Sequence, residues 1–346
     1  MPARSRRRWV LPLLVGVLGA SVVAGVAVGT VSISPLTSVR LFAWKLHLAG
    51  QPTGVPDSTH VILFQLRLPR VLLAGMVGAG LAAAGALFQA LFRNPMADPA
   101  IIGVSSGAAM GAIGAILAGA GTAIGGLGVP VSAFAGALAT GFLVYRLARL
   151  GPTIQVATLL LAGIAVAGVI SAAMSLVMTF SGEQIRTIYL WLLGGLSQAG
   201  WRPLLAALPF VVTGAGVALF SAGDLNVTAL GEERAAQLGV EVERFKRLML
   251  GTGALLTAAA VSVAGVIGFV GLMTPHVLRL VVGADHRRLL PASLLGGAAF
   301  MILADLVARS AVRPEEVPVG VITALLGGPF FLYLLRKQRR LAGARG

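Results

Sequence analysis

The chain has no cysteine and few charged side chains, and both shortages restrict what it can be. Without cysteine it forms no disulfide, thiolate metal site or cysteine nucleophile. Charged residues make up 11% of its 346 residues, whereas 57% are hydrophobic, and soluble domains usually carry roughly 25% charged residues. Apolar runs recur along the chain without a polar linker between them. We therefore expect an all-α membrane protein with a single transmembrane domain over residues 1–346.

Motifs of hydrolytic enzymes are also missing. The sequence contains no GxxxxGK[ST] phosphate loop, no H-E-x-x-H and no G-x-S-x-G. It also has no evident nucleophile or metal-ligand cluster, and His276, which follows Pro275 in an expected helix break, fits a structural hydrogen bond better than a metal. We predict no catalytic residues, no metal site and no cofactor. If ATP drives this protein, a separate chain must hydrolyse it.

Apolar stretches long enough to cross a bilayer, about 20 residues each, predict about ten transmembrane helices. A separate run, IYLWLLGGL, predicts a helix lying at the interface between residues 184 and 196. The first stretch also resembles a signal peptide, but its apolar run is about twice the usual length. The expected spans are residues 10–31, 67–92, 100–118, 129–147, 155–180, 203–221, 247–273, 275–283, 289–309 and 318–335.

The net charge of +15 suggests nucleic-acid binding until its placement is considered. If the N-terminal RSRRR is cytoplasmic and the spans alternate, 19 of the 27 basic residues lie in the cytoplasm. This bias follows the positive-inside rule. We therefore expect an inner-membrane protein with cytoplasmic N-terminus (1–9) and C-terminus (336–346), a membrane-lipid environment and no nucleic-acid partner.

Polar residues that interrupt the apolar helices are the candidate sites. Arg67 and Arg70 flank Pro69, where a helix can begin, and two guanidiniums at a helix N-terminus oppose the macrodipole. An external carboxylate partner explains them, and contact with lipid headgroups is the alternative. Near the end of a later span, Asp305 and Arg309 are four residues apart and share a helix face, so the simplest interpretation is an ion pair between them.

Two turns complete the set of polar segments. Asn94 and Asp98, in the turn NPMADP, are expected to bond free backbone groups and are assigned no chemistry. The loop from Asp224 to Arg247 is the most polar segment. Within it, Glu232 to Leu238 predicts a short helix between Gly231 and Gly239, with Ala235 and Leu238 on one face. Such a helix suits a groove on another protein, and a solvated loop is the alternative.

Six motifs occur in an order that closely resembles the FecCD family of ABC-importer permeases. The resemblance covers about residues 60 to 335, and the order of the motifs makes it specific. The motifs are RLPR, QALFRNPMADP, GVSSGAAMG, GxxxAxxLG in the polar loop, GFVGLMTPHVLRL with ADHR, and ADLVAR followed by ExPVGVITALLGGPFFLYLL.

The resemblance implies a ten-helix subunit of the type II importer fold with an inverted repeat, acting by alternating access at a homodimer interface. It implies two copies of a cytoplasmic ABC ATPase and a periplasmic or lipid-anchored substrate-binding protein as partners. By resemblance, Arg67, Arg70 and Arg309 dock the binding protein. The coupling loop, residues 222–246, enters the ATPase groove through Ala229, Leu230, Gly231, Glu232, Ala235, Leu238 and Gly239.

The resemblance implies an iron chelate as cargo, a ferric siderophore first, with haem or vitamin B12 as alternatives. Two other classes of membrane protein fit the sequence less well. A secondary transporter needs intramembrane acids for ion coupling, and Asp305, the only clear candidate, lies near the end of its span. A membrane enzyme needs a nucleophile or metal cluster that the sequence does not offer.

Overall fold

The computed structural model describes residues 9–29, 33–45, 47–50, 55–151, 153–312 and 314–343. Within them the chain is almost wholly helical, with one short antiparallel hairpin, β1–β2. The main helices are α2 (Val10–Ala27), α3 (Pro35–Lys45), α4 (Asp57–Val61), α5 (Leu68–Leu91), α6 (Val104–Leu117), α7 (Ala123–Gly126), α8 (Gly128–Ala148), α9 (Val156–Thr179), α10 (Ile185–Leu192), α11 (Trp201–Phe220), α12 (Ala222–Thr228), α13 (Glu232–Gln237), α14 (Val242–Ala264), α15 (Val270–Val282), α16 (His286–Ala308) and α17 (Val319–Gly343). The shorter elements are η1 (Ile62–Arg67), η2 (Pro99–Ile102), η3 (Ala120–Thr122), η4 (Gly182–Gln184), β1 (Arg149–Leu150) and β2 (Thr153–Ile154).

The expected number of spans, about ten, is close to what the structure shows. In the described part of the chain eight helices are long and apolar enough to cross a membrane, and a ninth arises if α6 and the bent segment Ala120–Gly126 count together. Helix α15, the remaining expected span, is apolar but shorter than these helices. The predicted interfacial helix is α10, whose Ile188 packs on the bundle while Ile185 and Tyr189 stay exposed.

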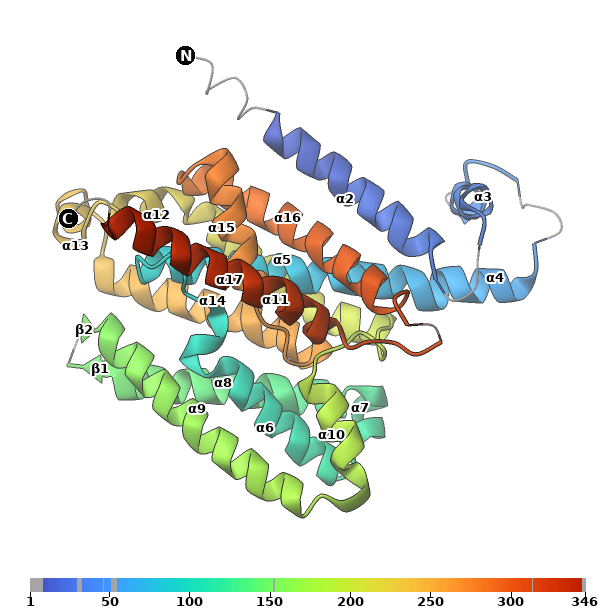
Figure 1. Cartoon of the computed structure of the whole chain (residues 1–346), viewed down its shortest axis with the longest axis horizontal. Coiled ribbons are helices and arrows are strands. Elements are labelled where there is room, and N and C mark those ends of the chain that lie inside the picture. Colours follow the sequence, from blue (N-terminus) through green and yellow to red (C-terminus); the bar gives the residue numbers. More distant parts are fainter. Residues whose placement is uncertain are drawn as a thin grey trace.

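Helix α5 runs through the middle of the bundle, with α14, α15 and α16 packed around it (Figure 1). The contacts repeat in two halves: α5 packs on α15 and α16, and α14 packs on α6 and α8. Each of these central helices is followed by a short helix after a break, and then by two long ones. The order of elements thus repeats in the two halves, as the inverted repeat expected of the fold requires. The most apolar stretch of the rod Asp57–Leu91, which contains α5, is 89% buried.

Small residues let α5 approach its neighbours. A Cβ added at Gly78 would collide with the Gly297 carbonyl of α16, and one added at Gly85 would collide with the Gly271 carbonyl of α15. Side chains are therefore excluded at both crossings. In lipid, where helices gain little from the hydrophobic effect, such close backbone contact is a main source of association.

The prediction that a helix begins at Pro69 is wrong. Helix α4 begins at Asp57 and continues through the π-helix η1 into α5, so the rod extends about three turns beyond Pro69. A proline inside an α-helix removes one hydrogen bond and clashes with the carbonyl four residues earlier. The wider π-helical turn ends at Arg67, just before Pro69, where it can accommodate the ring.

The expected break at Pro275 is also displaced. Residues 265–269 form the break, where Gly265 and Phe269 have positive φ values of 68° and 67°. Pro275 and His276 then lie inside α15, where the His276 ring meets the edge of Phe330 at a centroid distance of 6.0 Å. The apolar stretch 247–273 is therefore two helices, α14 and α15, and not one span.

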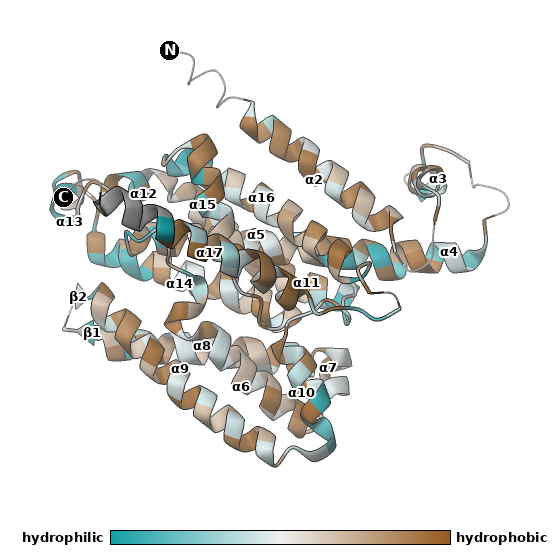
Figure 2. Ribbon diagram, in the orientation of Figure 1, coloured by the Kyte–Doolittle hydropathy of each residue, from teal (hydrophilic) through white to brown (hydrophobic). Residues whose placement is uncertain are grey.

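Hydrophilic residues gather at the two ends of the bundle (Figure 2). One end carries α12, α13 and the hairpin, and the other carries α4 and the C-terminal end of α16 (Figures 1 and 2). The apolar middle between them is what a bilayer requires. The two polar sites of the sequence therefore lie at opposite ends.

Candidate functional site

The site at the α4 end is a cluster of five charged residues, here called the arginine cluster: Arg67, Arg70, Asp305, Arg309 and Glu316. Its centre is Asp305, which is 1% exposed. Arg70 donates from Nη2 to Asp305 Oδ1 at 2.8 Å and from Nη1 to Glu316 Oε1 at 3.0 Å. Arg309 Nε lies 3.3 Å from Asp305 Oδ2. The predicted pair of Asp305 with Arg309 is confirmed, and Arg70 joins it.

Arg67 and Arg309 both reach the C-terminal end of α2. Arg67 Nη1 donates to the carbonyls of Val26 at 3.0 Å and Ala27 at 2.9 Å. Arg309 donates to the carbonyl of Val28 at 2.7 Å and to that of Gly25. The last four carbonyls of a helix have no partner within it, and they form the negative end of its dipole. The two guanidiniums therefore cap α2.

An external carboxylate is therefore not needed to explain Arg67 and Arg70. The arginines do not sit at a helix N-terminus, because the helix begins at Asp57, and their charge meets the favourable end of α2 instead. Arg67 and Arg309 are buried, whereas the side chain of Arg70 is 15% exposed and that of Glu316 is 38% exposed. Only Arg70 and Glu316 give the cluster an open edge.

The site at the opposite end is the polar loop, residues 222–246, which folds into α12, α13 and the start of α14. The predicted short helix is confirmed as α13, and Gly239 follows it with φ 87°. The expected apolar face is wrong in one respect. Ala235 is fully buried, whereas Leu230 is 57% exposed and Leu238 is 64% exposed. The two leucines are therefore the apolar side chains that the polar loop presents.

Lys246 fixes α13 to α14. Its Nζ lies 2.7 Å from Glu232 Oε2 and 3.1 Å from Glu243 Oε1. The other Glu243 oxygen accepts a hydrogen bond from the Ile154 N–H at 3.0 Å, so the β1–β2 hairpin is joined to the same point. Movement of α13 is thereby linked directly to α14, a central helix.

Two further contacts fix α12. Arg93, at the end of α5, donates to the Thr228 carbonyl at 3.1 Å. Asn226 donates to Asp285 at 2.7 Å and accepts from the His286 N–H at 2.9 Å, at the start of α16. Burial acts to raise the pKa of Asp285, but hydrogen bonds from Asn226 and the Arg287 N–H outweigh it and lower the pKa. Asp285 is thus held as a carboxylate.

The turn between α5 and α6 forms as the sequence predicts. Asn94 Oδ1 accepts from the Met96 N–H at 2.9 Å, and Asp98 Oδ1 accepts from the Ala100 N–H at 2.8 Å. Burial raises the pKa of Asp98 above its usual value, despite that hydrogen bond. Both side chains therefore stabilise the turn between α5 and α6.

Sequence reasoning missed several polar residues that organise these sites. Glu316 heads the E-x-P-V-G motif and could have been singled out there, but nothing in the sequence couples it to Arg70. Asn226 and Lys246 are single polar residues without a local pattern. Gln89 is buried in α5, where it accepts from Arg279 at 3.0 Å and donates to the Leu272 carbonyl at 3.1 Å.

Within the described residues, no group of three or more His, Asp or Glu side chains is placed to hold a metal ion.

Several long helices leave most of their surface uncovered. Only 11% of the most apolar stretch of α9 is buried, and 22% of those of α2 and α17, against 89% for the rod that contains α5. On α9, the exposed side chains include Leu161, Ile164 and Val169. These surfaces face either lipid or another protein.

A helical bundle with eight to nine candidate spans and polar sites at its two ends is a multi-pass membrane protein. The chain belongs to the FecCD transport family, whose model matches residues 17–337. It is therefore an ABC-importer permease of the class that carries vitamin B12, haem or metal chelates.

Named relatives fit this class. The cobalamin import system permease protein BtuC of Halobacterium salinarum is 53% identical over 82% of this chain and 76% of its own length. The hemin transport system permease protein HmuU of Yersinia pestis is 43% identical over 83% of this chain and 86% of its own length. A solved structure described as an inward-facing conformation of a metal-chelate type ABC transporter has a TM-score of 0.82 and 34% identity, covering 94% of this chain and 98% of that one.

Proposed function

We propose that two copies of this chain form the membrane channel of an importer that moves a metal–tetrapyrrole chelate, of the cobalamin or haem kind, across the inner membrane. This proposal rests on family membership, combined with the two polar sites at opposite ends of an apolar bundle. A ferric siderophore, the cargo first expected from the sequence, stays a prediction to be tested beside these two. The names of the relatives above favour the tetrapyrroles.

The uncovered faces of α9 and α17 support the homodimer. Both helices are apolar, and both are far less buried than the central helices. A bulky chelate needs a path wider than the centre of one subunit, since α5 and its close neighbours fill that centre. We place the path between subunits, where one side opens at a time.

The arginine cluster supports docking of an external binding protein. Arg67, Arg70 and Arg309 remain the proposed docking residues, and we assign them two different roles. Arg70 contacts the binding protein directly, and the two buried arginines hold the docking surface in place. Arg70 lies at the open edge and is already paired with the half-exposed Glu316. An incoming carboxylate exchanges with Glu316 on Arg70, while Arg67 and Arg309 keep α2 in place.

The polar loop supports coupling to a separate cytoplasmic ATPase. Leu230 and Leu238 enter the ATPase groove together with the backbone at Ala229, Gly231 and Gly239. The Lys246 ion pair with Glu232 carries the movement to α14. This orientation puts both termini in the cytoplasm, although residues 1–8 and 344–346 lie outside the described part of the chain.

The test uses the cognate binding protein, which is incubated with cyanocobalamin, haem and a ferric siderophore, and then offered to the reconstituted permease. We expect retention of one tetrapyrrole, and loss of docking in Arg70→Glu, at the open edge of the cluster, with assembly intact. Retention of the siderophore alone would contradict the proposed cargo. Unchanged docking of Arg70→Glu would show that the arginine cluster does not dock the binding protein.

A further inference from the structure

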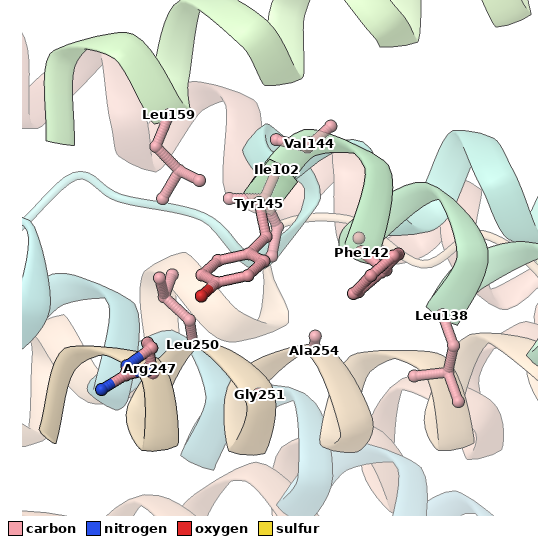
Figure 3. A pocket seen from close by; sticks show the side chains of 11 residues that line it. Ile102, Leu138, Phe142, Val144, Tyr145, Leu159, Arg247, Leu250, Gly251 and Ala254 are labelled. Atoms are coloured by element: carbon pink, nitrogen blue, oxygen red, sulfur yellow. The ribbon is translucent and has the colours of Figure 1, made fainter. Parts of the chain in front are cut away.

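An apolar cavity lies between α8, α9 and α14, far from the arginine cluster and next to the end of the polar loop. Its volume is about 340 Å³, which falls within the range of small-molecule sites, roughly 300–1,000 Å³. Leu138, Phe142, Leu159 and Leu250 supply apolar walls, and Gly251 and Ala254 leave the α14 side open (Figure 3). The walls belong to helices that are expected to span the membrane.

One end of this cavity is polar. Arg247 lies there, and the Tyr145 hydroxyl points toward that same end (Figure 3). Arg247 is in the second turn of α14, and Tyr145 is in the last turn of α8, so the polar end faces the side of the bundle that carries the polar loop. The cavity thus has an apolar body inside the membrane and a cationic mouth at its surface.

Arg247, at this mouth, lacks an acidic partner. Arg146 and Arg149, at the end of α8, are exposed but do not line the cavity. Across the described residues, none of Arg146, Arg149 and Arg247 forms an ion pair within 4.0 Å. By contrast, Arg244 nearby pairs with Glu241 at 3.6 Å. The positive charge of Arg247 at the mouth of the cavity is therefore not neutralised by an acidic side chain.

We propose that this cavity binds an anionic phospholipid of the cytoplasmic leaflet, with one acyl chain between α8 and α14 and the headgroup phosphate on Arg247. Basic pockets between membrane helices on the cytoplasmic side bind such headgroups, and guanidinium matches phosphate geometry with two hydrogen bonds. The assignment of this end to the cytoplasm rests on the proposed function.

Gly251 provides a direct test, because a Cβ added there meets nothing within 4 Å. Gly251→Leu therefore places an apolar side chain into the cavity from an open position on its wall. Gly16→Leu is the matched control, since Gly16 on α2 also has open space around its Cβ. Arg247→Gln removes the charge, and Arg244→Gln is its control because Arg244 is 78% exposed and already paired.

The measurement is photo-cross-linking of the full chain in phosphatidylcholine vesicles that contain a trace of phosphatidylglycerol with a diazirine on one acyl chain, or the same probe as phosphatidylcholine. We expect phosphatidylglycerol to label α8 and α14 roughly fivefold more than phosphatidylcholine, as one arginine near a charged surface predicts. Arg247→Gln should remove this preference, and Gly251→Leu should abolish labelling of the residues that line the cavity by both probes. Both control variants should behave as wild type.

Equal labelling by the two probes, or labelling unchanged by Gly251→Leu, overturns the proposal. The probe is present in both leaflets and no transport is measured, so the result does not depend on orientation or on cargo. Failure of this site is thus distinguishable from failure of the proposed function.

Discussion

Arg70 and Asp305 are joined across 235 positions of sequence, with Arg70 Nη2 2.8 Å from Asp305 Oδ1. The contact fastens the start of α5 to the end of α16, and through Arg309 it also reaches α2. One buried carboxylate thus organises three helices at the end where we propose that the binding protein docks.

Removing the carboxylate of Asp305 should destabilise the protein strongly. Asp305→Asn leaves Arg70 and Arg309 without their shared buried partner, and breaking a buried pair in this way costs about 3–5 kcal/mol. The matched variant Glu316→Gln removes the exposed partner of Arg70 and should cost roughly 0–1 kcal/mol. Thermal unfolding in detergent compares the two. Equal losses of stability would contradict the central role of Asp305.

Loss of Arg67 should loosen the C-terminal end of α2. Arg67→Met leaves the Val26 and Ala27 carbonyls without their cap, at a cost of roughly 1 kcal/mol. Because the chain has no cysteine, Val26→Cys gives a single reporter that is buried in the wild type. Its reaction with maleimide should accelerate roughly fivefold. The control is Arg40→Met, an exposed arginine of α3, and an unchanged rate in Arg67→Met would show that α2 does not need this cap.

Adding charge to the exposed leucine of the polar loop should weaken the ATPase contact. Leu238→Asp places a carboxylate where we propose an apolar anchor, and such anchors are typically worth enough to lower affinity roughly tenfold. Gln237→Asp adds the same charge at the neighbouring exposed position and should have a smaller effect. Co-purification of the cognate ATPase measures both. If both variants retain the ATPase equally, Leu238 is not an anchor.

Packing of α5 on α16 should tolerate no side chain at Gly78. Gly78→Leu forces the two backbones apart, and such overpacking costs about 1–3 kcal/mol or more. Gly114→Leu is the control, since its Cβ meets nothing within 4 Å. The yield of folded protein after mild heating should fall only for Gly78→Leu. Similar yields for both would argue that the crossing adjusts easily.

Much of the fold can be predicted from the sequence, because the length of each apolar run and the placement of basic residues beside it are local properties of the chain. The spans, the α13 helix between Gly231 and Gly239, and the 94–98 corner all depend on residues close together in the chain. The arginine cluster does not: Arg67 is explained by carbonyls of α2, some 40 positions away. The rule that proline marks the first turn of a helix also fails here, because the helix continues through a π-helical turn before Pro69. Exposure of Leu230 in place of Ala235 depends on where α14 packs.

The claim that a separate ATPase drives import is tested most directly by identifying the energy source of transport. The measurement is accumulation of labelled cargo in vesicles that contain the permease, its cognate ATPase and its binding protein. We predict accumulation that requires ATP and the binding protein, and that Leu238→Asp reduces. Accumulation driven by an ion gradient, with neither ATP nor the ATPase present, would identify a secondary transporter and contradict the account.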